Sequence, residues 1–145
     1  MMKKAIVLFL TLTAVTPLLA GDDKPIQANN LPSAAREFIE RHFTTAEISL
    51  ATIDKELWDT TYEVFFTDGR KIEFDKNGQW KEIDCKYSRV PESAVPGEIN
   101  RYLAAQHPGR HVREIDRDRR DYEVKLDNGL ELKFDLRFQL IGYDD

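Results

Sequence analysis

The sequence contains a single cysteine, Cys85, among its 145 residues. One thiol excludes an intramolecular disulfide, so the fold must depend on a hydrophobic core. Only one long uncharged apolar run is present, at residues 5–20. Charged residues make up 32% of the chain and hydrophobic residues 41%. This balance excludes collagen-like, disordered and polytopic membrane proteins, and the length allows one ordinary domain or two small ones.

The chain also has no basic cluster. It carries 21 lysines and arginines against 26 aspartates and glutamates, for a formal net charge of −5. An acidic chain repels phosphate backbones, so the sequence predicts no nucleic-acid partner. It has no glycine-rich phosphate loop, no zinc-type spacing of Cys and His, and no Gly-x-Ser-x-Gly motif. We therefore expect no cofactor, no metal site and no catalytic residue. The run from Asp116 through Asp118 to Asp121 has no glycine and holds three arginines, which favours a charged hairpin tip over a calcium loop.

The N-terminus has the pattern of a secretory signal peptide. Lys3 and Lys4 precede the apolar run, which ends at Ala20 and is followed by polar residues. The run is shorter than a bilayer-spanning helix, and a small residue stands at its boundary. The sequence predicts cleavage after Ala20, a periplasmic or secreted protein, and no stable membrane anchor after cleavage. Pro17 disfavours the alternative, an uncleaved anchor.

The most informative feature of the chain is an internal repeat. Residues 62–69, YEVFFTDG, are echoed by residues 122–129, YEVKLDNG. Upstream, Leu31-Pro32 is echoed 64 residues later by Val95-Pro96. The segment 62–69, by contrast, is echoed after only 60 residues. The first copy therefore carries about four additional residues near residues 54–61.

Each copy is expected to begin with a helix and continue as strands. Pro32 and Pro96 stand where a helix tolerates proline, and apolar residues follow them at helical spacing. Apolar residues then alternate with polar ones, as in strands with one buried face. The predicted fold is α+β: two tandem repeats, each a helix plus an antiparallel sheet, with the helices covering one face of the sheet.

The turns at Asp68-Gly69 and Asn128-Gly129 predict hairpins. The alternation of side chains between the two faces of the sheet, odd against even positions, selects the loop length. A three-residue loop pairs Val64 with Ile72 and keeps the apolar side chains on one face, whereas a two-residue loop inverts one strand. The longer loop needs Gly69 in a left-handed conformation. The opposite face then carries charged residues, among them Glu63 and Glu73 in the first copy and Glu123 in the second, and is open to water or to a partner. In the second copy, Lys125 lies opposite Glu131 and Glu123 opposite Lys133, which predicts cross-strand ion pairs.

The repeats divide the chain into a signal peptide (1–20), an N-terminal linker (21–30), repeat 1 (31–85), a linker (86–94) and repeat 2 (95–145), with both repeats in one domain. The turn at residues 135–139 lacks the glycine of the corresponding turn at 75–79. The position of the last strand, and whether the two sheets pair edge to edge, are left open.

Several of these motifs together resemble one protein family. They are the signal peptide, the helix start at Leu31-Pro32, the strand Tyr62-Glu63-Val64 with Asp68-Gly69 and Phe74-Asp75, and the doubling of the pattern. Over residues 28–143 the chain resembles the PepSY-like family of exported proteins from Gram-negative gut bacteria. That family is often called beta-lactamase-inhibitor-like, because its tandem units look similar to those of the beta-lactamase inhibitory protein. The resemblance implies tandem helix-plus-sheet units in one curved sheet and a binding or inhibitory role.

Three aromatic residues have no evident place in the predicted core and are candidates for partner binding. Trp58 lies in the additional segment of repeat 1, Phe65 interrupts the charged sheet face, and Tyr87 lies in the linker. Tryptophan and tyrosine bury a large area with few rotatable bonds, which suits them to interfaces. Local packing is the alternative for Trp58 and Phe65.

These observations favour an exported, non-enzymatic binding module that engages an unidentified protein or peptide through its open sheet face and the Trp58 loop. The first alternative is a periplasmic carrier of a small lipid-like or glycan ligand, with an apolar pocket between the helices and the sheet. An enzyme that uses Cys85 as a nucleophile is a third hypothesis, although no neighbouring residue in the sequence orients a histidine toward it.

Overall fold

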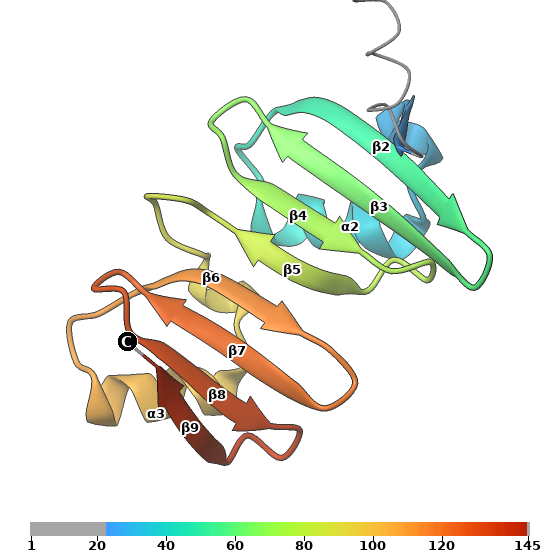
Figure 1. Ribbon diagram of the computed structural model, residues 1–145. Helices are drawn as coiled ribbons and strands as arrows, with labels where there is room; N and C mark the ends of the chain where they lie inside the picture. Colours follow the sequence, from blue (N-terminus) through green and yellow to red (C-terminus); the bar gives the residue numbers. More distant parts are fainter. Residues whose placement is uncertain (1–22, 145) are drawn as a thin grey trace, which may run out of the picture.

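The computed structural model describes residues 23–144, and within them the protein is an α+β fold with one antiparallel sheet of nine strands and two α-helices. The strands lie in the sheet in the order of the sequence, so each strand pairs with the next (Figure 1). The elements are β1 (Asp23–Ile26), η1 (Ala28–Asn30), α2 (Ser33–His42), β2 (Ile48–Glu56), β3 (Asp59–Phe66), β4 (Lys71–Phe74), β5 (Trp80–Asp84), η2 (Glu92–Ala94), α3 (Gly97–Gln106), β6 (Val112–Arg117), β7 (Asp121–Leu126), β8 (Glu131–Asp135) and β9 (Leu140–Asp144).

Both helices begin directly after a proline, as the sequence predicts. Pro32 precedes α2, and its carbonyl oxygen accepts hydrogen bonds from the first turn. Pro96 precedes α3 in the same way. Each helix packs against the sheet through an aromatic contact: the Phe38 ring lies 6.0 Å from that of Phe74, and the Tyr102 ring 5.4 Å from that of Phe134. In Figure 1, α2 lies behind β3 and β4, and α3 lies behind the C-terminal strands.

The two hairpins have the predicted registers. Val64 pairs with Ile72, and Val124 pairs with Leu132. All four side chains are buried, since none is more than 1% exposed. Gly69 has a φ of +93° and donates its N–H to the carbonyl of Phe66, which closes the three-residue loop. The loop-length prediction is therefore confirmed.

The two halves of the chain share one sheet and one core. Strand β5 pairs with β6, and Ile83 lies opposite Ile115 with both side chains fully buried. Arg117 of β6 donates a hydrogen bond to the carbonyl of Trp80 at 2.7 Å, and its guanidinium lies 4.3 Å from the centre of the indole ring. His42, at the end of α2, adds a 2.8 Å hydrogen bond to Ser93 of η2. The edge-to-edge pairing that the sequence left open is therefore made at β5 and β6.

The N-terminal linker expected at residues 21–30 is wrong in part, because Asp23–Ile26 form strand β1 and Ala28–Asn30 form η1. Strand β1 pairs with β2, with Pro25 opposite Thr52. A proline has no N–H to donate, and it is tolerated there because β1 is an edge strand. Hydrophobic periodicity is too short over these residues to predict a strand.

The last strand is present as β9, although the turn before it lacks a glycine. In the first half Gly78 has a φ of +83° and lies against the start of α2, where an added Cβ would come within 2.9 Å of the Ala35 nitrogen. In the second half Phe138 adopts the left-handed conformation, with a φ of +66°. Its ring packs 5.2 Å from the Tyr122 ring. This aromatic contact offsets the backbone strain of a left-handed phenylalanine.

None of the helices within residues 23–144 combines the length and the apolar character that crossing a membrane requires. The predicted signal peptide and the predicted cleavage after Ala20 lie outside the described residues.

Candidate functional site

The open face of the sheet carries a row of acidic side chains that crosses five neighbouring strands. Each member lies directly opposite the next in the strand register, from β3 to β7. We call this set the carboxylate row; it consists of Glu63, Glu73, Glu82, Asp116 and Glu123. Carboxylates directly opposite one another repel, so such a row destabilises an isolated sheet. A run of like charges on the central strands therefore needs a compensating charge.

The row faces away from the core because strand side chains alternate between the two faces. Val64 and Ile72 point into the core and are fully buried, so Glu63 and Glu73 beside them point outward. The pairing of β4 with β5 has a register shift: Glu73 lies opposite Glu82, but the next residue, Phe74, lies opposite Trp80. Strand β5 therefore has one extra residue at this point, and the alternation of its side chains is broken. This irregularity places Trp80 in the core and still leaves Glu82 on the open face.

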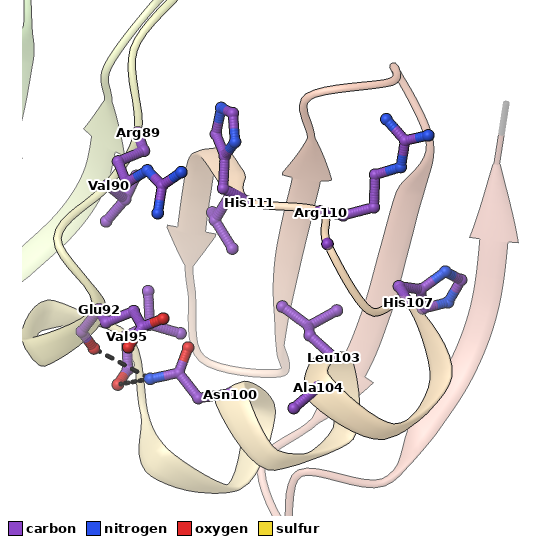
Figure 2. A pocket seen from close by; sticks show the side chains of 12 residues that line it. Arg89, Val90, Glu92, Val95, Asn100, Leu103, Ala104, His107, Arg110 and His111 are labelled. Atoms are coloured by element: carbon purple, nitrogen blue, oxygen red, sulfur yellow. Dashed lines mark hydrogen bonds between the residues drawn. The ribbon is translucent and has the colours of Figure 1, made fainter.

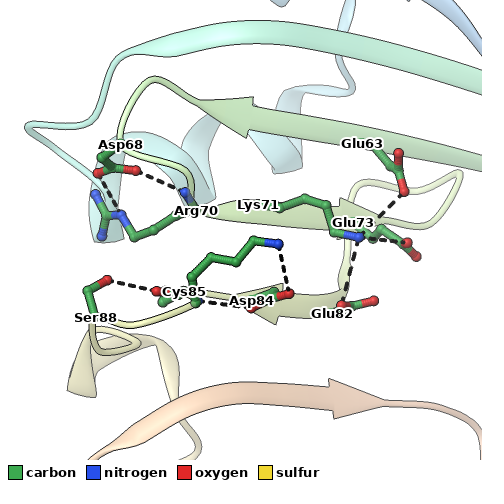
Figure 3. Close-up of polar contacts among 10 residues, drawn as sticks. Glu63, Asp68, Arg70, Lys71, Glu73, Glu82, Asp84, Cys85 and Ser88 are labelled. Atoms are coloured by element: carbon green, nitrogen blue, oxygen red, sulfur yellow. Dashed lines mark hydrogen bonds and ion pairs between the residues drawn. The ribbon is translucent and has the colours of Figure 1, made fainter.

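Lys71, on β4, lies beside the first part of the row and contacts three of its members. Its Nζ is 3.8 Å from Glu63, 3.7 Å from Glu73 and 3.8 Å from Glu82 (Figure 3). Burial by itself lowers the pKa of Lys71, but the charges of Glu82, Glu63 and Glu73 outweigh it and raise the pKa above its ordinary value. One ammonium therefore offsets part of the charge of three carboxylates.

Lys71 does not offset all of the negative charge, and two carboxyl groups of the row have raised pKa values. Burial, followed by a shared hydrogen bond with Glu73, raises the pKa of Glu63 to about 7. Burial and the charges of Glu82 and Glu114 raise the pKa of Asp116 to about 7. The Oδ1 atom of Asp116 is buried and has no hydrogen-bond partner among residues 23–144. The row therefore retains uncompensated negative charge at its centre, where β5 meets β6.

The C-terminal part of the face is better compensated. Lys133 lies 3.6 Å from Glu123 and 3.9 Å from Asp121, and Lys125 lies 3.6 Å from Glu131. The predicted cross-strand ion pairs of this hairpin are thus confirmed. Each contributes only about 0.2–1 kcal/mol because the side chains are partly solvated.

One member of the row and two neighbouring carboxylates come close enough to share a cation. Oxygen atoms of Glu82, Asp84 and Glu114 all lie within 4.8 Å of one another. Glu114 lies opposite Asp84 in the register, and burial is the main cause that raises the pKa of Glu82 and of Glu114. Carboxylate oxygens are ligands that suit Ca²⁺. The sequence predicted no metal site; among the residues that the structure describes, this cluster is the group on the open face whose donors fit one.

The predicted partner-binding aromatics do not form a single patch. Trp58 is 90% exposed at the β2–β3 turn, at one end of the strands. Phe65 lies near the other end of β3, on the open face opposite Lys71, and is partly buried. Tyr87 is 92% exposed after β5, at the same end as Phe65. The carboxylate row lies between these two ends, and the binding role of the three aromatics stays a prediction.

Sequence reasoning placed Glu63, Glu73 and Glu123 on the polar face but missed Glu82 and Asp116. Their place in the row depends on the pairing of β5 with β6 and on the irregularities in both strands. No local signal encodes that pairing. Asp118, by contrast, lies at an exposed hairpin tip as predicted, where it accepts hydrogen bonds from the N–H groups of Arg120 and Asp121.

Comparison with known proteins yields one family match. Residues 60–142 match the model of a family described as "Putative beta-lactamase-inhibitor-like, PepSY-like". A search of curated proteins finds no significant match.

Several solved structures are similar over most of the chain, among them three from Bacteroides species. One, described as a putative periplasmic protein of the DUF2874 family from Bacteroides vulgatus, is 48% identical with a TM-score of 0.83, over 86% of this chain and 98% of that chain. A second, described as a putative calcium-regulated periplasmic protein from Bacteroides thetaiotaomicron, is 47% identical with a TM-score of 0.82, over 86% and 98%. A third, described as a putative periplasmic protein of unknown function from Bacteroides vulgatus, is 38% identical with a TM-score of 0.79, over 85% and 99%.

Proposed function

Because the chain belongs to the PepSY-like, beta-lactamase-inhibitor-like family, we propose that it is an exported, non-enzymatic binding protein that engages a protein or peptide through its open sheet face. The carboxylate row carries this proposal. Its negative charge is compensated only in part by Lys71 and Lys133. The partner with the matching chemistry is a segment rich in lysine or arginine, whose charges offset the repulsion within the row.

The fold organisation that goes with this function is a tandem repeat. We infer that the two halves are copies of one folding unit, each with its helix on the same face. The equivalent hairpin registers, Val64 with Ile72 and Val124 with Leu132, support this inference. Helices that cover one face leave the other free along its whole width.

The properties of Cys85 support a non-enzymatic role. Its side chain is 1% exposed, and burial raises the pKa of the thiol to about 11. A cysteine nucleophile needs an accessible thiolate, which these surroundings disfavour.

The proposal predicts salt- and pH-dependent binding of a basic peptide. A fluorescent lysine-rich peptide is titrated with the protein and followed by anisotropy. Binding should weaken with added salt, since the contact is electrostatic. It should strengthen as the pH rises through about 7, because Glu63 and Asp116 lose their protons there.

A matched pair of variants tests whether the face itself binds. The double variant Glu82→Gln, Asp116→Asn removes two charges from the row, whereas Glu37→Gln, Glu40→Gln removes two from the exposed side of α2. The first should weaken binding by about tenfold or more, and the second should leave it nearly unchanged. Equal losses in both variants would show that only net charge matters and would contradict the proposal.

Regulation by calcium is a second candidate function, favoured by the cluster of Glu82, Asp84 and Glu114. The similar Bacteroides thetaiotaomicron protein is described as calcium-regulated, and in this chain the three carboxylates offer hard oxygen donors within 4.8 Å of one another. A bound Ca²⁺ would replace Lys71 as the charge that compensates Glu82.

Calorimetry with Ca²⁺ and with Mg²⁺ tests this second function. Ca²⁺ should bind the wild-type chain and raise its melting temperature, and Glu114→Gln should abolish both effects. Mg²⁺ should bind more weakly, because it requires a tighter octahedral geometry. Binding of Ca²⁺ that survives in Glu114→Gln would refute the assignment.

A further inference from the structure

A second candidate site lies on the helix-bearing side of the protein, away from the carboxylate row. It is a cavity of about 310 Å³ that is bounded by α3, by the segment that precedes α3 and by the segment that joins α3 to β6 (Figure 2). Cavities of about 300–1,000 Å³ are the size that holds small molecules. Its lining includes Arg89, Glu92, Val95, Leu103, Ala104 and His111.

The cavity exists because its walls are held apart and the side chains on α3 are short. Asn100 folds back against the preceding segment, where its Nδ2 donates hydrogen bonds to the carbonyls of Glu92 at 2.9 Å and Val95 at 3.3 Å. Val90 donates its N–H to the carbonyl of Val112 at 2.8 Å and fixes that segment to the start of β6. Ala104 follows one turn later on α3 and leaves the space open.

One wall of the cavity is apolar. Val90, Val95, Leu103 and Val112 are buried members of the core that also line the cavity. They can receive a short hydrocarbon group without leaving a buried polar atom unpaired.

The opposite wall is cationic. Figure 2 shows Arg89, His111 and Arg110 on the side of the cavity across from Leu103 and Ala104. The Arg110 guanidinium and the His111 ring both lie 3.6 Å from the carboxylate of Asp127, so Asp127 offsets the charge of Arg110. Arg89 has no ion-pair or hydrogen-bond partner among the residues described, 23–144. Its guanidinium is therefore free to receive an anion.

Among residues 23–144, Glu92 is the only carboxylate that lines the cavity, whereas two arginines, Arg89 and Arg110, line it. His107 is also part of the lining, but its ring lies 6.4 Å from the Tyr143 ring and points away from the other lining residues (Figure 2). The charge that a ligand meets is thus set by Arg89 on one side and Glu92 on the other.

We propose that this cavity binds a small carboxylate ligand with a short apolar body, whose carboxylate pairs with Arg89 and whose apolar body lies against Val95 and Leu103. An arginine that receives a carboxylate makes charge-assisted, two-pronged hydrogen bonds, which are among the stronger polar contacts in proteins. The site shares no residue with the carboxylate row, so this proposal is independent of the binding function proposed above.

Three small probes separate the two parts of the proposed interaction. Hexanoate has both the charge and the apolar body, hexanol has only the body, and acetate has nearly only the charge. In NMR titrations of the full mature chain, hexanoate should shift the amide signals of Leu103 and Ala104 in a saturable way. Hexanol and acetate should each bind about tenfold or more weakly, since each lacks one contact.

A matched pair of charge variants then tests the orientation. Arg89 and Glu92 are both exposed at the cavity, so Arg89→Gln and Glu92→Gln should fold as the wild type does. Arg89→Gln should weaken hexanoate binding by about tenfold, whereas Glu92→Gln should leave it equal or stronger because it removes a repulsive charge. Ala104→Phe fills the cavity and should abolish binding while the melting temperature stays near that of the wild type.

The proposal is overturned if hexanoate gives no saturable shifts, or if hexanol binds as well as hexanoate. It is also overturned if Arg89→Gln and Glu92→Gln weaken binding equally, because the carboxylate would then not lie at Arg89. None of these results bears on the peptide titration, which reports on the other face of the sheet.

Discussion

Replacing Asp116 with asparagine should stabilise the protein at neutral and alkaline pH. Burial and the neighbouring charges of Glu82 and Glu114 raise the pKa of Asp116 from 3.8 to about 7, so its ionised form is disfavoured in the folded state. One pKa unit corresponds to about 1.4 kcal/mol, which gives an upper bound of about 4 kcal/mol for the full difference. Because the carboxyl group is partly solvated, screening reduces the expected gain for Asp116→Asn to about 1–2 kcal/mol.

The gain should depend on pH in a defined direction. A carboxyl group with a raised pKa binds its proton more tightly in the folded than in the unfolded chain, so wild-type stability falls as the pH rises from about 4 to about 7. Above that range the group is ionised in both states and its contribution is constant. Urea denaturation of wild type and Asp116→Asn, in buffer with EDTA, should therefore give nearly equal free energies of unfolding near about pH 4 and diverge toward about pH 8.

Asp118→Asn is the matched control, two positions along the chain. Backbone N–H groups of Arg120 and Asp121 lower the pKa of Asp118, so its ionised form is favoured in the folded state. The same substitution there should leave stability unchanged or lower it at neutral pH. If Asp116→Asn fails to stabilise at about pH 8, or stabilises equally at about pH 4, the carboxylate row does not hold uncompensated charge as argued.

Other substitutions test the fold and the core. Gly78→Ala should lower the free energy of unfolding by about 2–3 kcal/mol, because Gly78 has a φ of +83° and an added Cβ would come within 2.9 Å of the Ala35 nitrogen. Gly69→Ala has the similar φ of +93° but open space around it, and should cost only about 1 kcal/mol in urea denaturation. Val64→Ala should cost about 2 kcal/mol, and a loss below about 0.5 kcal/mol would contradict its placement in the core. Cys85 should resist alkylation in the native protein and react once urea unfolds it, since its thiol is 1% exposed.

Some of the candidate site followed from local rules. The alternation around Val64 and Val124, together with the parity of the hairpin loops, placed Glu63 and Glu123 on the open face. The site's centre did not follow, because Glu82 and Asp116 come together only when β5 pairs with β6. That pairing joins strands that are separated in the sequence by helix α3. In addition, the register shift between Glu73 and Phe74 interrupts the regular alternation of side chains from which the sheet faces were predicted.

The cavity beside α3 was equally inaccessible to sequence reasoning. An apolar pocket between helix and sheet was one hypothesis, but its position depends on how Asn100 folds back and on the hydrogen bond between Val90 and Val112. Arg89 gave no signal of its own, since an arginine in a linker is ordinary.

The sequence by itself determined the two hairpins, their registers and the polarity of the two sheet faces, because these depend on side-chain alternation over a few residues and on a glycine in each turn. Only the tertiary structure decided that the two halves join through β5 and β6. The concentration of negative charge is a property of that junction, since repulsion between carboxylates depends on distances between strands that no local pattern encodes.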